Sequence, residues 1–219
     1  MRRLGLLIPS SNVVLEPLAA KQPGLQVHVT RLGVLDVKLD AGSRAQFEMD
    51  KQVGAAKLLC DAKVDAIVWG GTSASWLGIE HDEIFVRRVE AETGVPATTT
   101  VLEINRKLAE LGARRIGFVT PYTKDVAEQI NRNYAAMGYE IAGWQNDGGD
   151  LSNDFANIPA DTIRRMIDDV AQNDVEAIVI MCTNVAAAAL AVQMQARLGV
   201  AIIDSAAATL DLPGWLVSE

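Results

Sequence analysis

The chain has 219 residues, of which 49% are hydrophobic and 22% are charged, a composition that is typical of a folded globular protein and excludes a disordered one. Its 20 basic and 28 acidic side chains leave a net charge of −8, which argues against binding to nucleic acid or to an anionic membrane. Two cysteines and two histidines are too few for a disulfide framework or a zinc site, so we expect no metal.

The chain begins with two arginines and a short apolar run at residues 4–8. This run is too short for the core of a secretory signal peptide, so we interpret it as a buried first strand. No stretch approaches the roughly 20 apolar residues that a membrane-spanning helix needs. We therefore expect a cytoplasmic protein, in which thiols stay reduced.

Segments of the first half of the chain recur in the second half in the same order. RRLGLLIPS at 2–10 is similar to RRIGFVTPY at 114–122, an offset of 112 residues. VDAIVWGGTS at 64–73 is similar to VEAIVIMCTN at 175–184, an offset of 111, and a weaker match joins GVP to GVA at an offset of 105. Any parallel α/β protein can produce one such match, but three in order indicate an internal duplication.

Each half has apolar strands that alternate with helical patterns. Strands without polar alternation are typical of parallel strands that are covered on both faces. The helical patterns occupy residues 45–60, 81–92, 101–111, 126–137 and 159–172. We predict an α/β fold with two pseudo-symmetric parallel-sheet lobes, each a three-layer (αβα) flavodoxin-like unit, with the active site in the cleft between them.

The repeat also predicts a domain organisation. We expect a first α/β lobe at 1–105, a second at 106–205, and a C-terminal tail at 206–219 that packs near the first lobe. Ligands of open α/β sheets bind outside the carboxyl ends of the strands, and pseudo-twofold symmetry brings equivalent loops face to face. The loops that follow equivalent strands therefore define the candidate site.

Four such loops begin at Pro9, Gly71, Pro121 and Cys182 and read PSSN, GTS, PYT and CTN. They contain hydroxyls, an amide and one thiol but no Lys, Arg, Asp or His. Neutral donors and backbone N–H groups at helix N-termini suit a carboxylate ligand. Small polar residues at these positions also serve as ordinary helix caps, and this structural interpretation stays open.

Cys182 is the most informative single residue. A buried structural role is common for an intracellular cysteine, but this one ends an apolar strand and is expected to open a helix, where the dipole favours the thiolate. Cys60 lies on an amphipathic helix and His28 in a strand-like run, so we interpret both as structural. His81 follows the loop at Gly71 and is either structural or close to the site.

The loop sequences resemble the aspartate/glutamate racemase superfamily, and within it the maleate cis-trans isomerase and arylmalonate decarboxylase branch. The resemblance spans roughly residues 1–205. Racemases and isomerases of this superfamily carry one cysteine on each of two facing loops, whereas this chain has Gly71 at the first position and Cys182 at the second. The arylmalonate decarboxylases have this same arrangement, but the PSSN and CTN loops are more similar to the isomerases.

The resemblance implies a function. Glycine is neither a base nor a nucleophile, so Gly71 argues against two-base racemization and against addition to maleate. The implied reaction is cofactor-independent decarboxylation of a malonate-like or related dicarboxylic acid through an enediolate, which Cys182 protonates from one face. A dioxyanion hole would use side chains together with backbone N–H groups at Cys182 and Thr183. The implied substrate-binding residues are Thr72, Ser73, Tyr122, Thr183, Asn12, Asn184 and Pro9.

Two other functions stay open. One is an isomerase or racemase in which Tyr122 or His81 replaces the first cysteine, and the other is a carboxylate-binding protein without catalysis. In every case we expect a small carboxylic or dicarboxylic acid as ligand, no cofactor, no nucleic acid or membrane partner, and a monomer or small homo-oligomer. Trp69, Trp76 and Leu77 form either an apolar wall of the site or part of the core.

Overall fold

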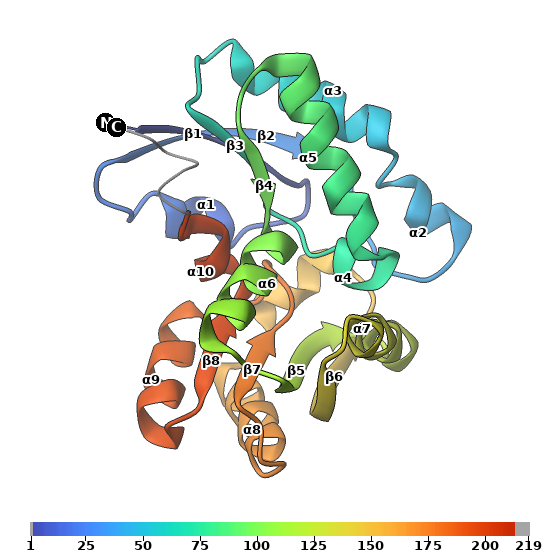
Figure 1. The fold of residues 1–219 in the computed structure, drawn as a ribbon, viewed down its shortest axis with the longest axis vertical. Coiled ribbons are helices and arrows are strands. Elements are labelled where there is room, and N and C mark those ends of the chain that lie inside the picture. Colours follow the sequence, from blue (N-terminus) through green and yellow to red (C-terminus); the bar gives the residue numbers. More distant parts are fainter. Residues whose placement is uncertain (1, 213–219) are drawn as a thin grey trace.

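The computed structural model describes residues 2–212, which form two lobes, each built on a four-stranded parallel sheet (Figure 1). The strand orders are β2-β1-β3-β4 in the first lobe and β6-β5-β7-β8 in the second. The prediction of two α/β lobes with the same topology is therefore confirmed. The strands are β1 (Arg2–Pro9), β2 (Leu25–Leu32), β3 (Ala66–Trp69), β4 (Ala97–Thr99), β5 (Arg115–Tyr122), β6 (Glu140–Gly149), β7 (Ala177–Ile180) and β8 (Ala201–Asp204).

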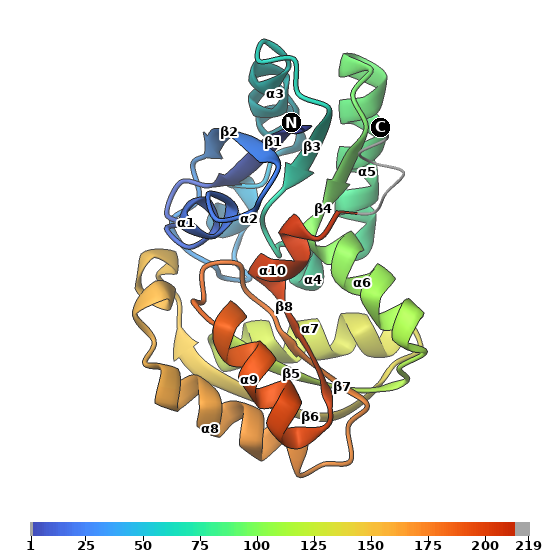
Figure 2. The ribbon, with the colours of Figure 1, turned by 90° about the vertical axis from the view of Figure 1, so that its left-hand side faces the viewer.

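Helices cover the sheets. In the second lobe the sheet lies between α7 on one side and α8 on the other (Figure 2). The helices are α1 (Leu15–Ala19), α2 (Ala41–Ala45), α3 (Met49–Cys60), α4 (Ala74–Leu77), α5 (Ile79–Thr93), α6 (Thr100–Leu111), α7 (Lys124–Ala136), α8 (Ala160–Ala171), α9 (Ala188–Leu198) and α10 (Ser205–Leu210), with one 3-10 helix, η1 (Ser152–Asn157).

The register of the two sheets repeats the sequence offsets. Leu4 of β1 is paired with Ala66 of β3, and Ile116 of β5 is paired with Ala177 of β7. These positions are equivalent at the offsets of 112 and 111 found in the sequence. The duplication thus extends from the amino-acid pattern to the hydrogen-bonded pairing of the strands.

A glycine in the first strand of each lobe makes the same close approach to a helix. A Cβ on Gly5 would lie 3.1 Å from Leu59 of α3, and one on Gly117 would lie 2.3 Å from Val170 of α8. Leu59 and Val170 are equivalent at the offset of 111. A side chain at position 117 would clash with its helix, and one at position 5 would make a tight contact, so glycine favours close packing of the helix in each lobe.

The central strands β1 and β3 of the first lobe are buried on both faces. Leu6 and Ile8 of β1 belong to a hydrophobic cluster that also contains Leu15 of α1. Leu7 of β1 and Trp69 of β3 point to the other face and belong to the cluster that includes side chains of α3 and α5. This two-sided burial explains why the strand sequences lack polar alternation.

The helix expected at 45–60 is broken in the structure. α2 ends at Ala45 and α3 begins only at Met49. Asp40 caps α2 as a separate short helix, and Phe47 turns into the core between the two helices, where it is only 4% exposed. The other four helical patterns correspond to α5, α6, α7 and α8.

α6 connects the two lobes and runs across the proposed boundary at residue 105. α10 contacts α6 and α1, and its residues Ala206 and Leu210 belong to a hydrophobic cluster of the first lobe. Residues 213–219 of the proposed tail lie outside the described residues. The division of the chain into domains therefore remains a proposal.

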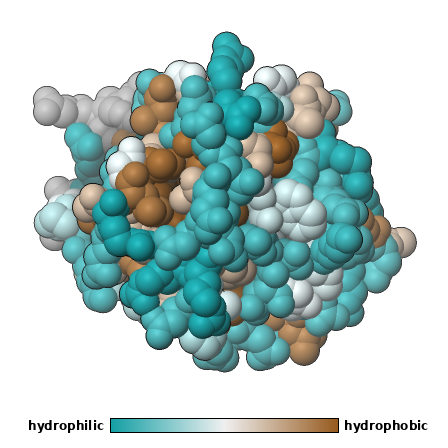
Figure 3. Space-filling model, turned by 90° about the horizontal axis from the view of Figure 1, so that it is seen from below, coloured by the Kyte–Doolittle hydropathy of each residue, from teal (hydrophilic) through white to brown (hydrophobic). Residues whose placement is uncertain are grey.

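The face of the second lobe shown in Figure 3 is mostly hydrophilic, with small apolar areas between the polar side chains. Within residues 2–212, no helix combines the length and the hydropathy needed to cross a membrane.

Candidate active site

A buried cavity lies where the carboxyl ends of β1, β3, β5 and β7 meet. All nine residues that the sequence singled out line this cavity, although their chemical roles remain predictions. None of its lining residues carries a charge at neutral pH. The lining residues are Pro9, Asn12, Val34, Val37, Phe47, Trp69, Gly71, Thr72, Ser73, Trp76, Tyr122, Ser152, Phe155, Cys182, Thr183 and Asn184.

Asn12 and Thr183 join the two lobes beside the cavity. The Asn12 Nδ2 donates to Thr183 Oγ1 over 3.1 Å, and this hydroxyl donates to the carbonyl of Gly70 over 2.9 Å. The Asn12 Oδ1 accepts hydrogen bonds from the backbone N–H groups of Val14 and Leu15, both at 3.0 Å. The side-chain amide of Asn12 is thus bonded to protein partners on both sides.

Asn184 makes the corresponding contacts from the second lobe. Its Oδ1 accepts from the Val13 N–H over 2.9 Å, and its Nδ2 donates to the carbonyls of Ser152 (2.6 Å) and Ser11 (3.3 Å). Both asparagines are at most 2% exposed. In this structure their amides join the two lobes, and the expected contact with substrate stays a prediction.

Hydroxyl groups from both lobes face the cavity. Thr72 Oγ1 and Tyr122 Oη lie 2.8 Å apart, and the indole Nε1 of Trp69 donates to Ser73 Oγ over 3.3 Å. The Thr72 and Tyr122 pair uses one of its two protons internally, and Ser73, which accepts from the indole, keeps its own proton. The cavity therefore presents neutral hydroxyl donors, as the sequence predicted.

Cys182 is 4% exposed and lies in a loop. The prediction that its thiol opens a helix is wrong, because β7 ends at Ile180 and α9 begins only at Ala188. Burial raises the pKa of the thiol to about 11, although hydrogen bonds from Tyr122 and from the backbone of Asn184 lower it. The thiol is therefore protonated at neutral pH.

The Cys182 N–H and the Tyr122 phenol were both expected to bind a carboxylate, and the structure shows the surroundings of each. The backbone N–H of Cys182 donates to the carbonyl of Ile180 over 3.2 Å. Burial raises the pKa of Tyr122 well above its usual value, and the charge of a Cys182 thiolate would raise it further. The phenol is thus a neutral hydrogen-bond donor and not a base at neutral pH.

His81 does not line the cavity. Its Nε2 lies 3.0 Å from the carbonyl oxygen of Phe47, and its Nδ1 lies 3.7 Å from Asp82. The imidazole thus holds the backbone of a residue that does line the cavity. Leu77 also lies outside the lining, whereas Trp69 and Trp76 belong to it.

Sequence analysis missed the lining residues that come from two connecting segments. Val34, Val37 and Phe47 follow β2, and Ser152 and Phe155 belong to η1 after β6. Aliphatic and aromatic side chains outside regular strands carry no chemical pattern that marks them as part of a site. Only the folded chain brings them over the carboxyl ends of the strands.

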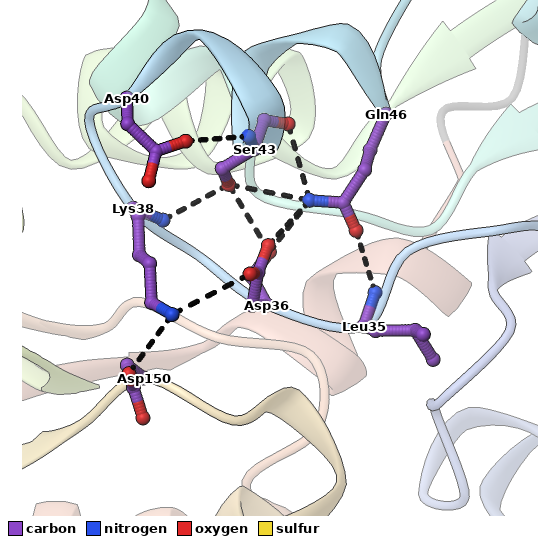
Figure 4. Close-up of polar contacts among 7 residues, drawn as sticks. All are labelled: Leu35, Asp36, Lys38, Asp40, Ser43, Gln46 and Asp150. Atoms are coloured by element: carbon purple, nitrogen blue, oxygen red, sulfur yellow. Dashed lines mark hydrogen bonds and ion pairs between the residues drawn. The ribbon is translucent and has the colours of Figure 1, made fainter.

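These two segments are bonded to each other across the lobes. The N–H of Val37 donates to the carbonyl of Asp150, and the N–H of Ser152 donates to that of Leu35, both over 3.0 Å. The Nζ of Lys38 lies 3.2 Å from an Asp150 carboxylate oxygen (Figure 4). The first-lobe segment thus covers the cavity and is attached to the second lobe.

A small polar network fixes the first-lobe segment (Figure 4). The backbone N–H of Lys38 donates to Ser43 Oγ over 3.0 Å, and that of Leu35 donates to Gln46 Oε1 over 2.7 Å. The Gln46 amide also donates to the Asp36 carboxylate over 2.5 Å. These bonds hold the covering segment in one conformation.

The covered cavity is small. Its volume is about 30 Å³, enough for about one or two water molecules. A larger cavity of about 590 Å³ lies beside the edge strand β8 and contains none of the predicted site residues. Entry of a ligand larger than this therefore requires the covering segments or the lobes to separate. Among residues 2–212, no cluster of His, Cys, Asp and Glu is arranged to hold a metal.

A fold of two lobes with one topology and the matches to known proteins place the chain in the branch of the aspartate/glutamate racemase superfamily that contains the arylmalonate decarboxylases and maleate isomerases. The chain belongs to the arylmalonate decarboxylase family, whose model matches residues 4–213.

Relatives with two different activities resemble the chain. A maleate isomerase of Nocardia farcinica (strain IFM 10152) is 24% identical over 233 residues, which cover 97% of this chain and 92% of the relative. A liganded mutant of arylmalonate decarboxylase has a TM-score of 0.85 at 20% identity, covering 95% of this chain and 89% of that one. The N. farcinica maleate cis-trans isomerase with a bound succinylcysteine intermediate has a TM-score of 0.84 at 22% identity, with coverages of 97% and 94%.

Proposed function

We propose that the protein is a cofactor-independent decarboxylase of a malonate-like dicarboxylic acid. The observation that carries this proposal is a single buried, protonated thiol at Cys182 in a cavity to which the first lobe contributes glycine at the equivalent position 71. Such a site offers one proton donor on one face of a substrate carbon and no second base. Decarboxylation followed by protonation needs one proton donor on one face of the carbon and does not need a second base.

Binding begins with the carboxylate that the substrate keeps. This group accepts hydrogen bonds from the Ser73 hydroxyl and from the one proton that the hydrogen-bonded pair of Thr72 and Tyr122 leaves free. The other carboxylate lies against apolar side chains, for which Val34 and Val37 of the lining are candidates. A carboxylate without hydrogen-bond partners in an apolar pocket is destabilised relative to neutral CO₂, which favours cleavage.

In the chemical step the bond between the α-carbon and the unpartnered carboxylate breaks and CO₂ leaves. The electron pair of this bond moves into the retained carboxylate and forms an enediolate. Fixed hydroxyl dipoles in a water-poor cavity stabilise the developing charge without reorganisation. The thiol of Cys182 then donates its proton to the α-carbon, and the thiolate regains a proton from solvent after the product leaves.

The pKa of Cys182 suits an acid and not a nucleophile. With burial raising this pKa to about 11, fewer than about one thiol in 10³ is ionised at pH 7. A nucleophile needs the thiolate, whereas a proton donor needs the thiol. The buried environment therefore supports protonation of an enediolate.

The test is decarboxylation of a panel of phenylmalonates and alkylmalonates, followed as CO₂ release. We expect turnover with at least one member and a loss of about 10²–10⁴-fold in Cys182→Ala. Cys60→Ala is the matched control, because Cys60 is a free thiol on α3 outside the cavity. Absence of turnover across the panel, or undiminished turnover in Cys182→Ala, would contradict the proposal.

An isomerase is the second candidate, favoured by the similarity to maleate isomerase over 97% of the chain. It requires another group in place of the first cysteine. His81 lies outside the cavity, and the phenol of Tyr122 is neutral and hydrogen-bonds toward Cys182, on the same side of the site. Conversion of maleate to fumarate, or exchange of the α-proton in D₂O without CO₂ loss, would establish this function instead.

A carboxylate-binding protein without catalysis is the third outcome of these experiments. It would show thermal stabilisation by dicarboxylates, no turnover of malonates or maleate, and no loss of stabilisation in Cys182→Ala. All three functions share a small carboxylic or dicarboxylic acid as ligand, which is the broader part of the proposal.

A further inference from the structure

The space above Gly71 is filled by the side chain of Trp69. A Cβ placed on Gly71 would lie 2.4 Å from Cζ2 and 2.6 Å from Cε2 of the indole. Real Cβ contacts essentially never fall below 3.0 Å. Gly71 does not have the positive φ that would itself demand glycine. The indole, and not the backbone conformation, therefore excludes a side chain at position 71.

The indole is held firmly in this space. Trp69 is completely buried, and its Nε1 donates to Ser73 Oγ over 3.3 Å. Its ring packs edge to face against Phe47, with ring centroids 6.4 Å apart and planes at 74°. All three residues line the cavity. A shift of the ring to admit a side chain at position 71 would break these contacts.

Trp69 and Gly71 have equivalents in the second lobe, where the first residue is smaller and the second is larger. At the offset of 111, Trp69 corresponds to Ile180 and Gly71 corresponds to Cys182. β7 ends in the smaller Ile180, and the residue two positions later, Cys182, has a side chain. β3 ends in the larger Trp69, and the residue two positions later is glycine. In each lobe one side chain of the pair, Trp69 or Cys182, lines the cavity.

We propose that Trp69 is a specificity-determining residue. Its indole takes the place of the side chain missing at position 71, forms the wall of the cavity opposite Cys182, and limits the size of the substituent on the substrate carbon. The identity of the substrate, though not the packing, rests on the proposed function above. The volume of about 30 Å³ left in the covered cavity fits a wall of this size.

Trp69 also positions a hydrogen-bond donor. An indole N–H is only a donor, so Ser73 Oγ must accept from it. The proton of the Ser73 hydroxyl is then free to point toward a bound carboxylate. Trp69→Phe keeps an aromatic wall but removes this N–H, whereas Trp69→Ile removes both the wall and the N–H.

The packing is tested by a cycle of Trp69→Ile and Gly71→Ala, read as Tm without any substrate. Gly71→Ala alone should lower Tm by roughly 2–12 °C, because the Cβ overpacks a full space. In the Trp69→Ile background the same substitution should lower Tm much less or raise it. Equal shifts in both backgrounds would overturn the inference.

Gly33→Ala is the matched control for this cycle, since nothing lies within 4 Å of a Cβ at Gly33 and its φ is not positive. It should give the same small shift in both backgrounds. The loss of Trp69 contacts lowers Tm of every variant that carries Trp69→Ile. Comparison with Gly33→Ala separates this general loss from the clash between the indole and a side chain at position 71.

The specificity is tested with malonates of increasing substituent size, from methyl to phenyl. Trp69→Ile should raise the ratio of kcat/KM for the largest to the smallest substituent at least about tenfold. Trp69→Phe should lower kcat/KM for all members with a much smaller change in this ratio. An unchanged ratio in Trp69→Ile would overturn the role in specificity.

If no malonate is decarboxylated, the proposed function fails and the same size preference is read as thermal stabilisation by each malonate. The Tm cycle decides the packing in either case. Failure of the function and failure of the inference are thus distinguished, because one is measured as CO₂ release and the other as Tm.

Discussion

The two lobes share a topology but differ where each borders the site. The first lobe ends its third strand with Trp69 and continues with Gly71, whereas the second ends with Ile180 and continues with Cys182. Both have a hydroxyl residue next, Thr72 or Thr183. The duplicated lobes thus place equivalent threonines beside the cavity but different walls, one aromatic and the other with a protonated thiol.

The lobes agree where packing alone is concerned. Gly5 and Gly117 lie under equivalent helices, and equivalent strands pair in the same register. A substitution at these positions would disturb the packing of a sheet against its helix, whereas a substitution at a strand end also changes the lining of the cavity. The comparison separates positions that hold the fold from positions that set the chemistry.

The residues that end the last strand of each lobe and cap the following helix show a second difference between the lobes. Thr99 ends β4 and accepts from the N–H of Leu102, and Asp204 ends β8 and accepts from the N–H of Ala207. Threonine is neutral, but Asp204 is 3% exposed, and burial raises its pKa to about 6. The second lobe therefore carries a buried acid in the position that is uncharged in the first.

Replacing Cys182 by glycine, the residue at the equivalent position of the first lobe, should have the largest effect on activity. Cys182→Gly leaves both lobes without a proton donor, so we expect a loss of about 10²–10⁴-fold in kcat for decarboxylation. The variant should still bind a malonate in a thermal-shift assay, since the hydroxyl donors remain. A kcat within tenfold of the native protein would show that the proton comes from elsewhere.

Removing one donor from either lobe should have the next largest effect. Thr72→Val and Tyr122→Phe each delete a hydroxyl of the 2.8 Å pair, and each should cost about 10²–10³-fold in kcat. The double variant should lose less than the product of the two, because the hydroxyls are partners. If only one of the two single variants lost kcat, the hydroxyl that donates to the substrate would come from that residue's lobe alone. Thr123→Val, outside the cavity lining, is the control.

The pH dependence distinguishes an acid from a nucleophile at Cys182. Burial raises the pKa of this thiol to about 11, so the protonated form persists from neutral pH into the alkaline range. A proton donor predicts kcat/KM that is flat with respect to this group from pH 7 to about 10 and falls above it. A thiolate nucleophile predicts a rise of about tenfold per pH unit below the pKa. Stopped-flow or steady-state rates between pH 7 and 10.5 decide between them.

The buried acid of the second lobe predicts a stability difference that depends on pH. Because the folded pKa of Asp204 is raised to about 6 from 3.8, the native state binds its proton more tightly than the unfolded state, and stability falls as pH rises from 3.8 through 6. Asp204→Asn removes this loss. At pH 8 it should be more stable by about 2–3 kcal/mol in urea unfolding, and at pH 3.5 the difference should vanish. Thr99→Ser in the first lobe should show no such pH dependence.

The ion pair across the covering segments should have the smallest effect. Lys38 and Asp150 are each about two-fifths exposed, at 40% and 44%, so solvent screens their attraction. Lys38→Met should change Tm little, and the change should disappear at high salt. Its sharper readout is KM for a malonate, because a looser covering segment alters access to the cavity. A large loss of stability would mean that this contact holds the lobes together.

Much of the fold followed from the sequence because its information is local or repeated. Apolar strands, helical patterns and the offsets of 111 and 112 predicted the two lobes. The rule that ligands bind at strand ends selected four loops, and the family resemblance selected nine residues in them, all of which line one cavity. The helix break at Phe47 was missed because it depends on burial of that ring between α2 and α3, which no helical periodicity reveals.

The environment of each site residue depended on neighbours that lie far away along the chain. The sequence alone identified Cys182, but its pKa depends on burial and on Tyr122, and both arise only when the lobes meet. Asn12 belongs to the site by sequence, yet only the folded chain shows its amide joined to Thr183. The sequence shows that position 71 is glycine, and only packing shows the indole that fills its place, because steric and electrostatic effects act through space.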